Sequence, residues 1–142
     1  MGITLSDRER TLIAAFEDET GAGVVDCVVL EDPERAVFVV RPGDMGDAIG
    51  PGGRAVKAAE DHLGWTIDLV EGADTPEAFV ANALAPAAVY DVAVEAEGER
   101  AVARAEVPEA DRGAAIGKGG RNIEKARRLA ARHFGIDDIE LA

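Results

Sequence analysis

Two kinds of hydrophobic spacing alternate along the chain, and together they predict helices and strands in a definite order. Leu12, Ile13 and Phe16 recur at helical spacing behind the capping box SDRE that starts at Ser6, which predicts a helix to about residue 19. The β-rich runs VVDCVVL and AVFVV predict a hairpin. The elements expected in this half after the first helix are strands at 24–30 and 36–40 joined by a turn at 32–34, a short helix at 44–49, a longer helix at 54–63 and a strand at 65–70.

The second half of the chain repeats this order. Thr75 as N-cap and Pro76 at the first helical position predict a helix that ends by residue 86. Tyr90, Val92 and Val94 alternate with other residues and predict a half-buried strand over 89–95. The elements expected next are a strand at 101–107, a short helix from residue 108, a longer helix at 121–133 and a strand at 136–141. We interpret Trp65 and Tyr90 as core aromatics.

A direct sequence repeat accompanies the repeated pattern. The segment DMGDAIGPGGR at 44–54 aligns without gaps with DRGAAIGKGGR at 111–121, and 8 of the 11 positions are identical. A duplication at this spacing indicates one structural unit used twice. The sequence therefore predicts two domains, residues 1–71 and 72–142, joined by a short linker at 72–74. Because domains of about 70 residues are marginally stable alone, we expect the two to share apolar surface.

The distribution of charge restricts where a polyanion could bind. The formal net charge is −13, from 15 Lys and Arg against 28 Asp and Glu, so most of the surface should repel nucleic acid. Residues 112–134 carry seven basic residues and one acid, and they form the only strongly basic window. We interpret the general acidity as an adaptation to concentrated salt, where surface repulsion is screened, rather than as an acidic binding face.

Several function classes find no support in the sequence. The single cysteine, Cys27, excludes an internal disulfide and any cysteine-cluster zinc site. We find no arrangement of catalytic residues, no metal-ligand pair and no Walker phosphate loop, and we expect neither an enzyme nor a bound cofactor. No apolar run reaches the roughly 18 residues of a membrane span, and the N-terminus has no apolar signal core. A cytoplasmic protein without membrane contact is expected.

The glycine loops and the helix after the second one carry the candidate chemistry. At 100° per residue, four cations of the helix at 121–133 fall on one face, and Ile123, Ala126, Ala130 and Phe134 fall opposite. Glycine lets a sugar-phosphate backbone come within hydrogen-bond range, and a helix N-terminus attracts phosphate. This combination indicates a site for a nucleic-acid backbone.

The pattern Ile-Gly-x-Gly-Gly-Arg between two helices resembles the GXXG loop of the KH module, which clamps about four backbone nucleotides of a single strand. The leading helix and hairpin resemble the prokaryotic, type II order, and the tandem arrangement resembles the paired KH region of the NusA family. The resemblance implies an α+β fold with two type II KH domains in tandem, each a three-stranded sheet packed on helices. It also implies single-stranded RNA as partner and a role in transcription termination or antitermination, and it leaves RNA polymerase or the elongation complex open as a further partner.

By this resemblance, the RNA-binding residues are the two loops and the cations of the helices that follow them. They are Gly50, Pro51, Gly52, Gly53, Arg54, Gly117, Lys118, Gly119, Gly120, Arg121, Lys125, Arg128 and Arg132. By position, an apolar groove would be lined by Ile49, Val56 and Ile67 in the first domain and by Ile116, Ile123 and Ile139 in the second, although we interpret all six as core residues.

We expect the second domain to carry most of the affinity for RNA. Pro51 offers the first loop neither an N–H nor a cation, and the helix face at Arg54, Ala58 and Asp61 has a single positive residue. Two alternatives stay open: a KH protein of RNA processing or ribosome assembly, and a KH-fold protein-interaction module without RNA binding.

Overall fold

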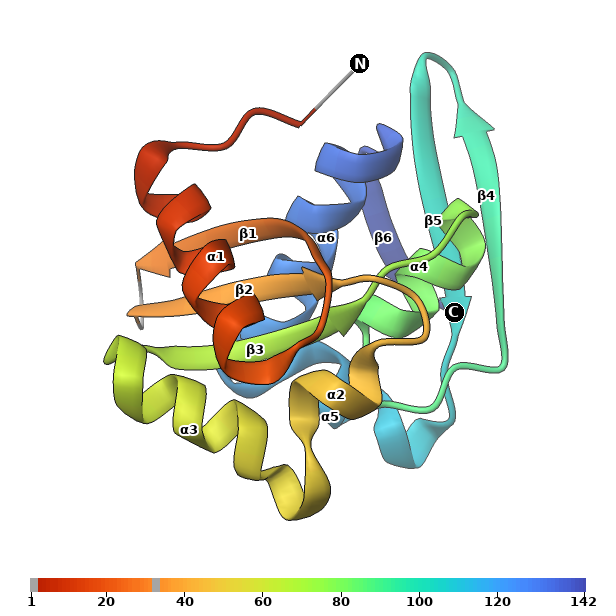
Figure 1. The fold of residues 1–142 in the computed structure, drawn as a ribbon. Coiled ribbons are helices and arrows are strands. Elements are labelled where there is room, and N and C mark those ends of the chain that lie inside the picture. The colour runs from red at the N-terminus through yellow and green to blue at the C-terminus, as the bar shows by residue number, and fades with distance from the viewer. Residues whose placement is uncertain (1–2, 32–33) are drawn as a thin grey trace. The chain divides into compact units, whose positions relative to one another are not determined.

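The computed structural model describes residues 3–31 and 34–142 (Figure 1). The chain divides into two compact units, Met1–Gly72 and Ala73–Ala142. Each unit contains one three-stranded sheet and its own helices, so the units are described separately.

The first unit begins with a capped helix and ends with a strand. The Ser6 hydroxyl accepts a hydrogen bond from the Glu9 amide at 3.1 Å, and the Glu9 carboxylate accepts one from the Ser6 amide at 2.8 Å, which confirms the predicted capping box. The elements are α1 (Asp7–Thr20), β1 (Val24–Glu31), β2 (Glu34–Val40), α2 (Met45–Ile49), the 3₁₀ turn η1 (Pro51–Gly53), α3 (Arg54–Leu63) and β3 (Thr66–Glu71).

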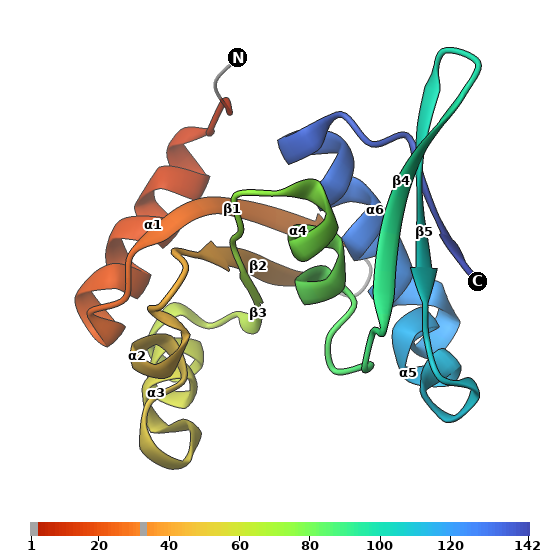
Figure 2. The same cartoon turned by 90° about the vertical axis from the view of Figure 1, so that its right-hand side faces the viewer.

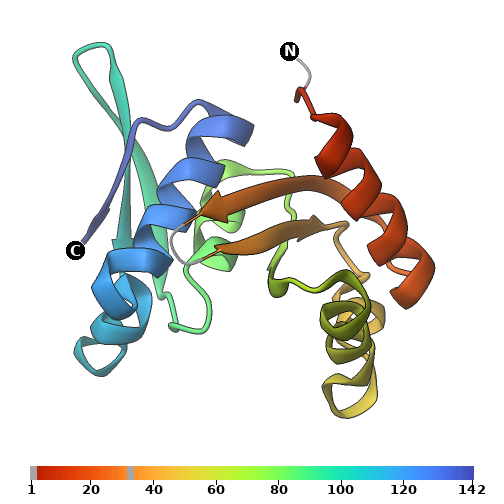
Figure 3. The ribbon, with the colours of Figure 1, turned by 90° about the vertical axis from the view of Figure 1, so that its left-hand side faces the viewer.

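The sheet of the first unit has the order β1-β2-β3, with β1 antiparallel and β3 parallel to β2. The predicted hairpin is therefore confirmed, while residues 32 and 33 of its turn lie outside the described residues. Helices α1 and α3 pack on one face of the sheet (Figure 3). The core between them includes Leu12 and Ala59, and Phe16 stacks on Phe38 with 4.4 Å between ring centroids.

The second unit repeats this fold with a longer final helix. Its sheet has the order β4-β5-β6 with the same antiparallel and parallel pairings, and α4 and α6 lie along one face (Figure 2). Helix α6 has 14 residues where α3 has 10, as the sequence predicted. The elements are α4 (Pro76–Ala83), β4 (Asp91–Glu97), β5 (Arg100–Glu106), η2 (Glu109–Asp111), α5 (Arg112–Ile116), η3 (Lys118–Gly120), α6 (Arg121–Phe134) and β6 (Asp138–Leu141).

One of the two aromatics assigned to the core is exposed. Trp65 is half-buried against the first core and lies under the Arg8 guanidinium, 5.3 Å from the ring centroid. Tyr90 is 75% exposed, so its interpretation as a core residue was wrong. The alternation places Tyr90 on the same face as Val92, but β4 begins only at Asp91, so the ring lies beyond the end of the strand.

The described residues provide neither a membrane span nor a metal centre. Every helix within the described ranges is too short or too polar to cross a lipid bilayer. Within the same ranges, no group of three or more His, Cys, Asp or Glu side chains could hold a metal ion. Cys27 is a buried thiol in β1.

Candidate nucleic-acid interface

The two glycine loops have nearly the same backbone conformation. Three glycines in each loop have positive φ, a region that side chains disfavour. Their φ and ψ angles are 74° and 168° at Gly50 against 78° and 169° at Gly117, 62° and 20° at Gly52 against 65° and 19° at Gly119, and 78° and 14° at Gly53 against 77° and 11° at Gly120. The repeated sequence therefore specifies the same corner twice.

The glycines within each loop have different roles. A Cβ atom added to Gly50 would lie 2.7 Å from the Cβ of Ala55, and one added to Gly117 would lie 2.7 Å from the Cβ of Asn122. The first glycine is therefore required so that the loop can approach the helix that follows. A Cβ atom at Gly52 or at the later glycines of either loop would meet no atom within 4 Å. The later glycines therefore leave the backbone open on its outer side.

Hydrogen bonds of the same kind fix both corners. The amide of Gly50 donates to the Gly46 carbonyl at 2.8 Å, and the amide of Gly53 donates to the Gly50 carbonyl at 3.0 Å. In the second loop the Gly117 amide donates to the Gly113 carbonyl at 2.8 Å and the Gly120 amide to the Gly117 carbonyl at 3.0 Å. Each loop is thus anchored to the short helix that precedes it.

An aspartate at the start of each short helix anchors that helix to its unit. Asp44 accepts a hydrogen bond from the Gly23 amide at 2.8 Å, and Asp111 accepts one from the Ala88 amide at 2.7 Å. Both donors lie in the segment that leads into the first strand of the sheet. These aspartates are the first identical position of the repeat, but no role was predicted for them from the sequence.

A second unassigned residue, Asn122, lies just after the second loop. Its side-chain amide nitrogen lies within hydrogen-bond distance of the carbonyl oxygens of Leu84 at 3.1 Å, Ala114 at 3.2 Å and Ala115 at 3.1 Å, so its two hydrogens are shared among three acceptors. The corresponding residue of the first unit is Ala55, which has no polar side chain. Residues 55 and 122 are the first positions after the repeated segment, and they differ between the two units.

The cationic face of α6 contains three exposed residues where four were predicted. Arg121, Arg128 and Arg132 are exposed, but Lys125 is 7% exposed, so its assignment to the exposed face was wrong. On the helical wheel Lys125 lies between the arginines and Leu129, which is buried. The helical period gives the angle of a side chain but not the width of the packed face.

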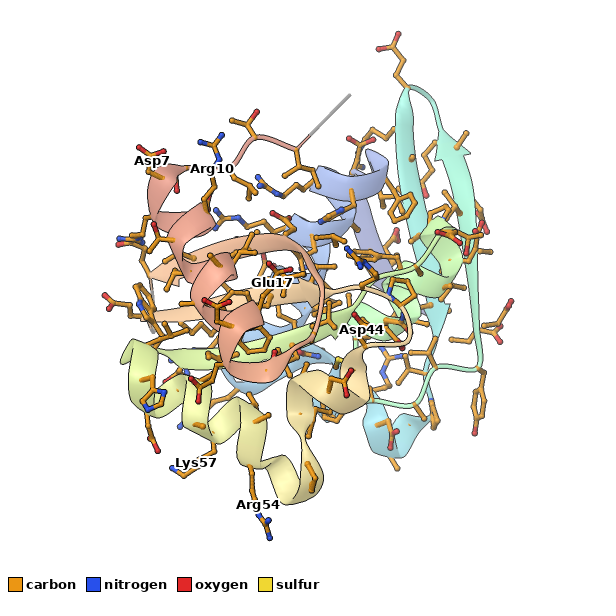
Figure 4. The ribbon with its side chains drawn as sticks, in the orientation of Figure 1. Asp7, Arg10, Glu17, Asp44, Arg54 and Lys57 are labelled. Carbon is orange, nitrogen blue, oxygen red and sulfur yellow. The ribbon has the colours of Figure 1, made fainter. Side chains whose placement is uncertain are left out.

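Helix α3 of the first unit has two exposed cations, whereas the sequence predicted one. Arg54 and Lys57 are exposed, and both side chains point away from the sheet (Figure 4). The ammonium of Lys57 lies 3.8 Å from the Asp61 carboxylate, an exposed pair that partly offsets its charge. Lys57 is the i+3 neighbour of Arg54, and the predicted face included only the residues that follow Arg54 at i+4 and i+7.

An isoleucine before each loop is exposed, contrary to its interpretation as a core residue. Ile49 is 39% and Ile116 is 40% exposed, whereas Ile67, Ile123 and Ile139 are buried as expected. Helices α2 and α5 have only five residues each and each buries a single alanine, so the terminal isoleucine remains at the surface. Each loop therefore has a half-exposed apolar side chain beside its open glycine backbone. Val56 is partly buried against the first core.

Two α-β-β-α-α-β units with a glycine corner between their paired helices define a tandem KH protein. Residues 12–80 match the KH domain family, and residues 76–142 match the NusA-like second KH domain. The chain is 58% identical over 141 residues to the probable transcription termination protein NusA of Halobacterium salinarum, covering 99% of each chain. It is 56% identical over 142 residues to the protein of the same name from Halococcus morrhuae, covering 100% of each. The chain belongs to the NusA family, in the form with two KH domains.

A solved structure has the same fold over nearly the whole chain. The crystal structure of APE1850 superposes with a TM-score of 0.85 at 33% sequence identity, covering 97% of this chain and 100% of that chain. These comparisons confirm the predicted fold class, an α+β protein with two KH domains in tandem.

Proposed function

We propose that this protein binds single-stranded RNA through its two glycine loops and acts, without catalysis, in transcription termination or antitermination in the cytoplasm. The observation that carries the proposal is the pair of matched corners, each with open glycine backbone. KH modules clamp the backbone of single-stranded RNA with such a loop. The names of its relatives favour transcription over RNA processing or ribosome assembly.

Each loop offers an RNA strand two kinds of contact. The open backbone at Gly52 and Gly119 allows phosphate oxygens to come close, and the helix that follows brings the positive end of its dipole to the same place. The exposed side chains of Ile49 and Ile116 offer an apolar surface for the face of a base. Backbone contact without reading of base edges positions a strand but does not specify its sequence.

We propose that the second unit carries most of the affinity. Lys118 places a cation at the tip of its loop, where the first loop has Pro51. The exposed cations Arg121, Arg128 and Arg132 follow on α6, whereas α3 offers two exposed cations, Arg54 and Lys57. Affinity for a polyanion increases with the number of phosphates neutralised.

Three glycines of nearly equal geometry allow a matched test of the RNA site. Gly52, Gly119 and Gly98 have φ angles of 62°, 65° and 64°, and a Cβ atom at each would meet nothing within 4 Å. Gly98 lies in the β4–β5 turn, outside both loops. Substitution of each by Asp adds one negative charge and similar backbone strain. The three variants therefore differ mainly in where on the protein the charge is placed.

We expect Gly119→Asp to weaken binding of single-stranded RNA by about tenfold or more, because a carboxylate would stand where a phosphate binds. Gly52→Asp should cost less, and Gly98→Asp should leave binding unchanged. Fluorescence anisotropy with a labelled oligonucleotide measures all three. If Gly119→Asp and Gly98→Asp bind RNA alike, or if the unchanged protein binds none, the chain is better explained as a protein-interaction module, a reading that its net charge of −13 favours.

We further propose the transcribing RNA polymerase, as part of the elongation complex, as a protein partner. The support is the transcription role in the names of the relatives. Co-purification of the chain with purified polymerase, with and without a nascent transcript, tests this partner. If the chain is retained on the polymerase only when a nascent transcript is present, RNA alone connects the two proteins and direct polymerase binding is excluded.

A further inference from the structure

The side-chain amide of Asn122 joins three backbone segments around the second loop. One nitrogen atom lies within 3.2 Å of carbonyl oxygens from Leu84, Ala114 and Ala115. Leu84 is the C-cap of α4, and the two alanines belong to α5. Asn122 itself belongs to the first turn of α6, so this contact connects all three helices of the unit.

The two α5 carbonyls need a donor from outside their own helix, whereas the Leu84 carbonyl also accepts a hydrogen bond from the Ala87 amide at 3.1 Å. The last four carbonyl groups of a helix have no partner within it. The chain leaves the helical conformation of α5 at Gly117, whose φ and ψ are 78° and 169°. Amides after the loop therefore cannot continue the backbone hydrogen bonds of α5. Asn122 supplies N–H groups at this place. Because its Cβ would lie only 2.7 Å from a Cβ atom added to Gly117, the same residue also packs directly against the loop.

The first unit forms the same corner without this contact. Its residue at the matching position is Ala55, and its loop carries Pro51 where the second has Lys118. Proline restricts φ and so stiffens a loop through the chain itself. The second loop has Lys118 in place of proline and lacks that restriction. The hydrogen bonds of the Asn122 side-chain amide, here called the amide clamp, hold it instead.

We propose that Asn122 is a positioning residue that holds the corner 117–120 in the conformation that receives RNA, an inference that rests on the proposed function. A loop held in its bound conformation before the ligand arrives loses less conformational entropy on binding. The clamp thereby allows the second loop to use a lysine at its tip without the rigidity of proline.

The test compares Asn122→Ala with the reciprocal Ala55→Asn. Asn122→Ala gives the second unit the residue that the first unit already has, so it should fold. We expect exchange of the Gly117 and Gly120 amide hydrogens to become about three- to tenfold faster, with exchange in the core of α6 unchanged, and RNA affinity to fall by a similar factor. Ala55→Asn should slow exchange at Gly50 and Gly53.

A further variant separates loop order from other effects. Adding Lys118→Pro to Asn122→Ala introduces the proline of the first loop at a position whose flanking glycines have matching backbone angles, and slow exchange at Gly117 and Gly120 should return. Unchanged exchange at these two amides in Asn122→Ala would overturn the proposal. Equal acceleration throughout the second unit would overturn it too, because Asn122 would then act only on global stability. If the unchanged protein binds no RNA, the proposed function fails, while the exchange data still decide whether the clamp orders the loop.

Discussion

At the scale of single residues, the first glycine of each loop is the most constrained position of the repeat. Gly117 has φ 78° and ψ 169°, a region nearly restricted to glycine, and a Cβ atom there would lie 2.8 Å from the backbone nitrogen of Asn122. Gly119 also has positive φ, but it is surrounded by open space and lies in the left-handed helical region that other residues can enter. The two positions therefore predict different costs for the same substitution.

We expect Gly117→Ala to lower the free energy of unfolding of the second unit by more than about 2 kcal/mol, because it adds a steric clash to backbone strain. Gly119→Ala should cost only about 1 kcal/mol. Urea unfolding of both variants measures the difference. Equal losses would show that the close approach of α6 to the loop is not what requires glycine at 117.

A pH-sensitive contact joins α1 and α3 in the first unit. His62 Nδ1 lies 2.8 Å from a Glu19 carboxylate oxygen, and this hydrogen bond, with the attraction of the carboxylate, raises the pKa of His62 above its ordinary value of 6.5. Since the folded pKa exceeds the unfolded one, the stabilisation is fully present below pH 6.5 and is lost as the pH rises through the folded pKa. Glu19→Gln should lower the His62 pKa toward the ordinary value in an NMR titration, and an unchanged pKa would contradict the assigned cause.

At the scale of elements, the exposed face of the second sheet is held by one arginine among three carboxylates. Arg104 in β5 contacts Glu95 and Glu97 of β4 at 3.1 and 2.5 Å and Glu140 of β6 at 3.3 Å. The hydrogen bond that Arg104 donates to Glu95 and the charges of the three acids raise the pKa of Arg104. This side chain therefore connects all three strands and offsets repulsion between acids of the same face.

Arg104→Gln should lower the melting temperature of the second unit, and the loss should be larger at 0.1 M than at about 1 M salt, because the Debye length falls from about 10 Å to about 3 Å. Arg100→Gln is the matched control, since Arg100 makes one weaker contact, 3.8 Å from Asp138. Thermal unfolding followed by circular dichroism gives both values. A loss that does not depend on salt would indicate lost packing rather than lost charge.

Most elements could be predicted from the sequence because their ends carry local signals. The Ser6 capping box, Thr75 with Pro76, and the glycines after α1, α3 and α6 mark helix boundaries by backbone chemistry alone. Burial was less predictable, because it depends on how far a packed face extends. Lys125, Ile49 and Tyr90 each lie at the boundary of such a face. The clamp of Asn122 depends on Leu84, 38 residues away, and no local pattern signals it.

At the scale of the whole molecule, a protein with net charge −13 binds a polyanion only where its charge is reversed. The second unit offers Lys118 and the three exposed arginines of α6 at that place. For an oligonucleotide short enough to bind the second unit alone, we expect the logarithm of the RNA affinity to fall with the logarithm of salt concentration with a slope no steeper than about −3, since each neutralised phosphate of a single strand contributes about −0.7.

Arg128→Gln should make this slope shallower by about 0.7 and leave the contribution of the loop backbone in place. Binding isotherms at several salt concentrations measure the slope for both proteins. A slope much steeper than −3 would mean that RNA contacts many more cations than this surface provides, and the assignment of the interface would be wrong.

The central claim is that the glycine corner of the second unit contacts the backbone of an unpaired RNA strand. The most direct measurement is a titration of the isotopically labelled protein with single-stranded oligonucleotides, followed by the amide signals of residues 116–121 at the salt concentration where the protein is most stable. The account predicts saturable shifts at these amides, larger than those at Gly50–Arg54 and absent at the Gly98 turn. Amide signals of 116–121 that stay in place while RNA binds elsewhere, or that never move, would contradict it.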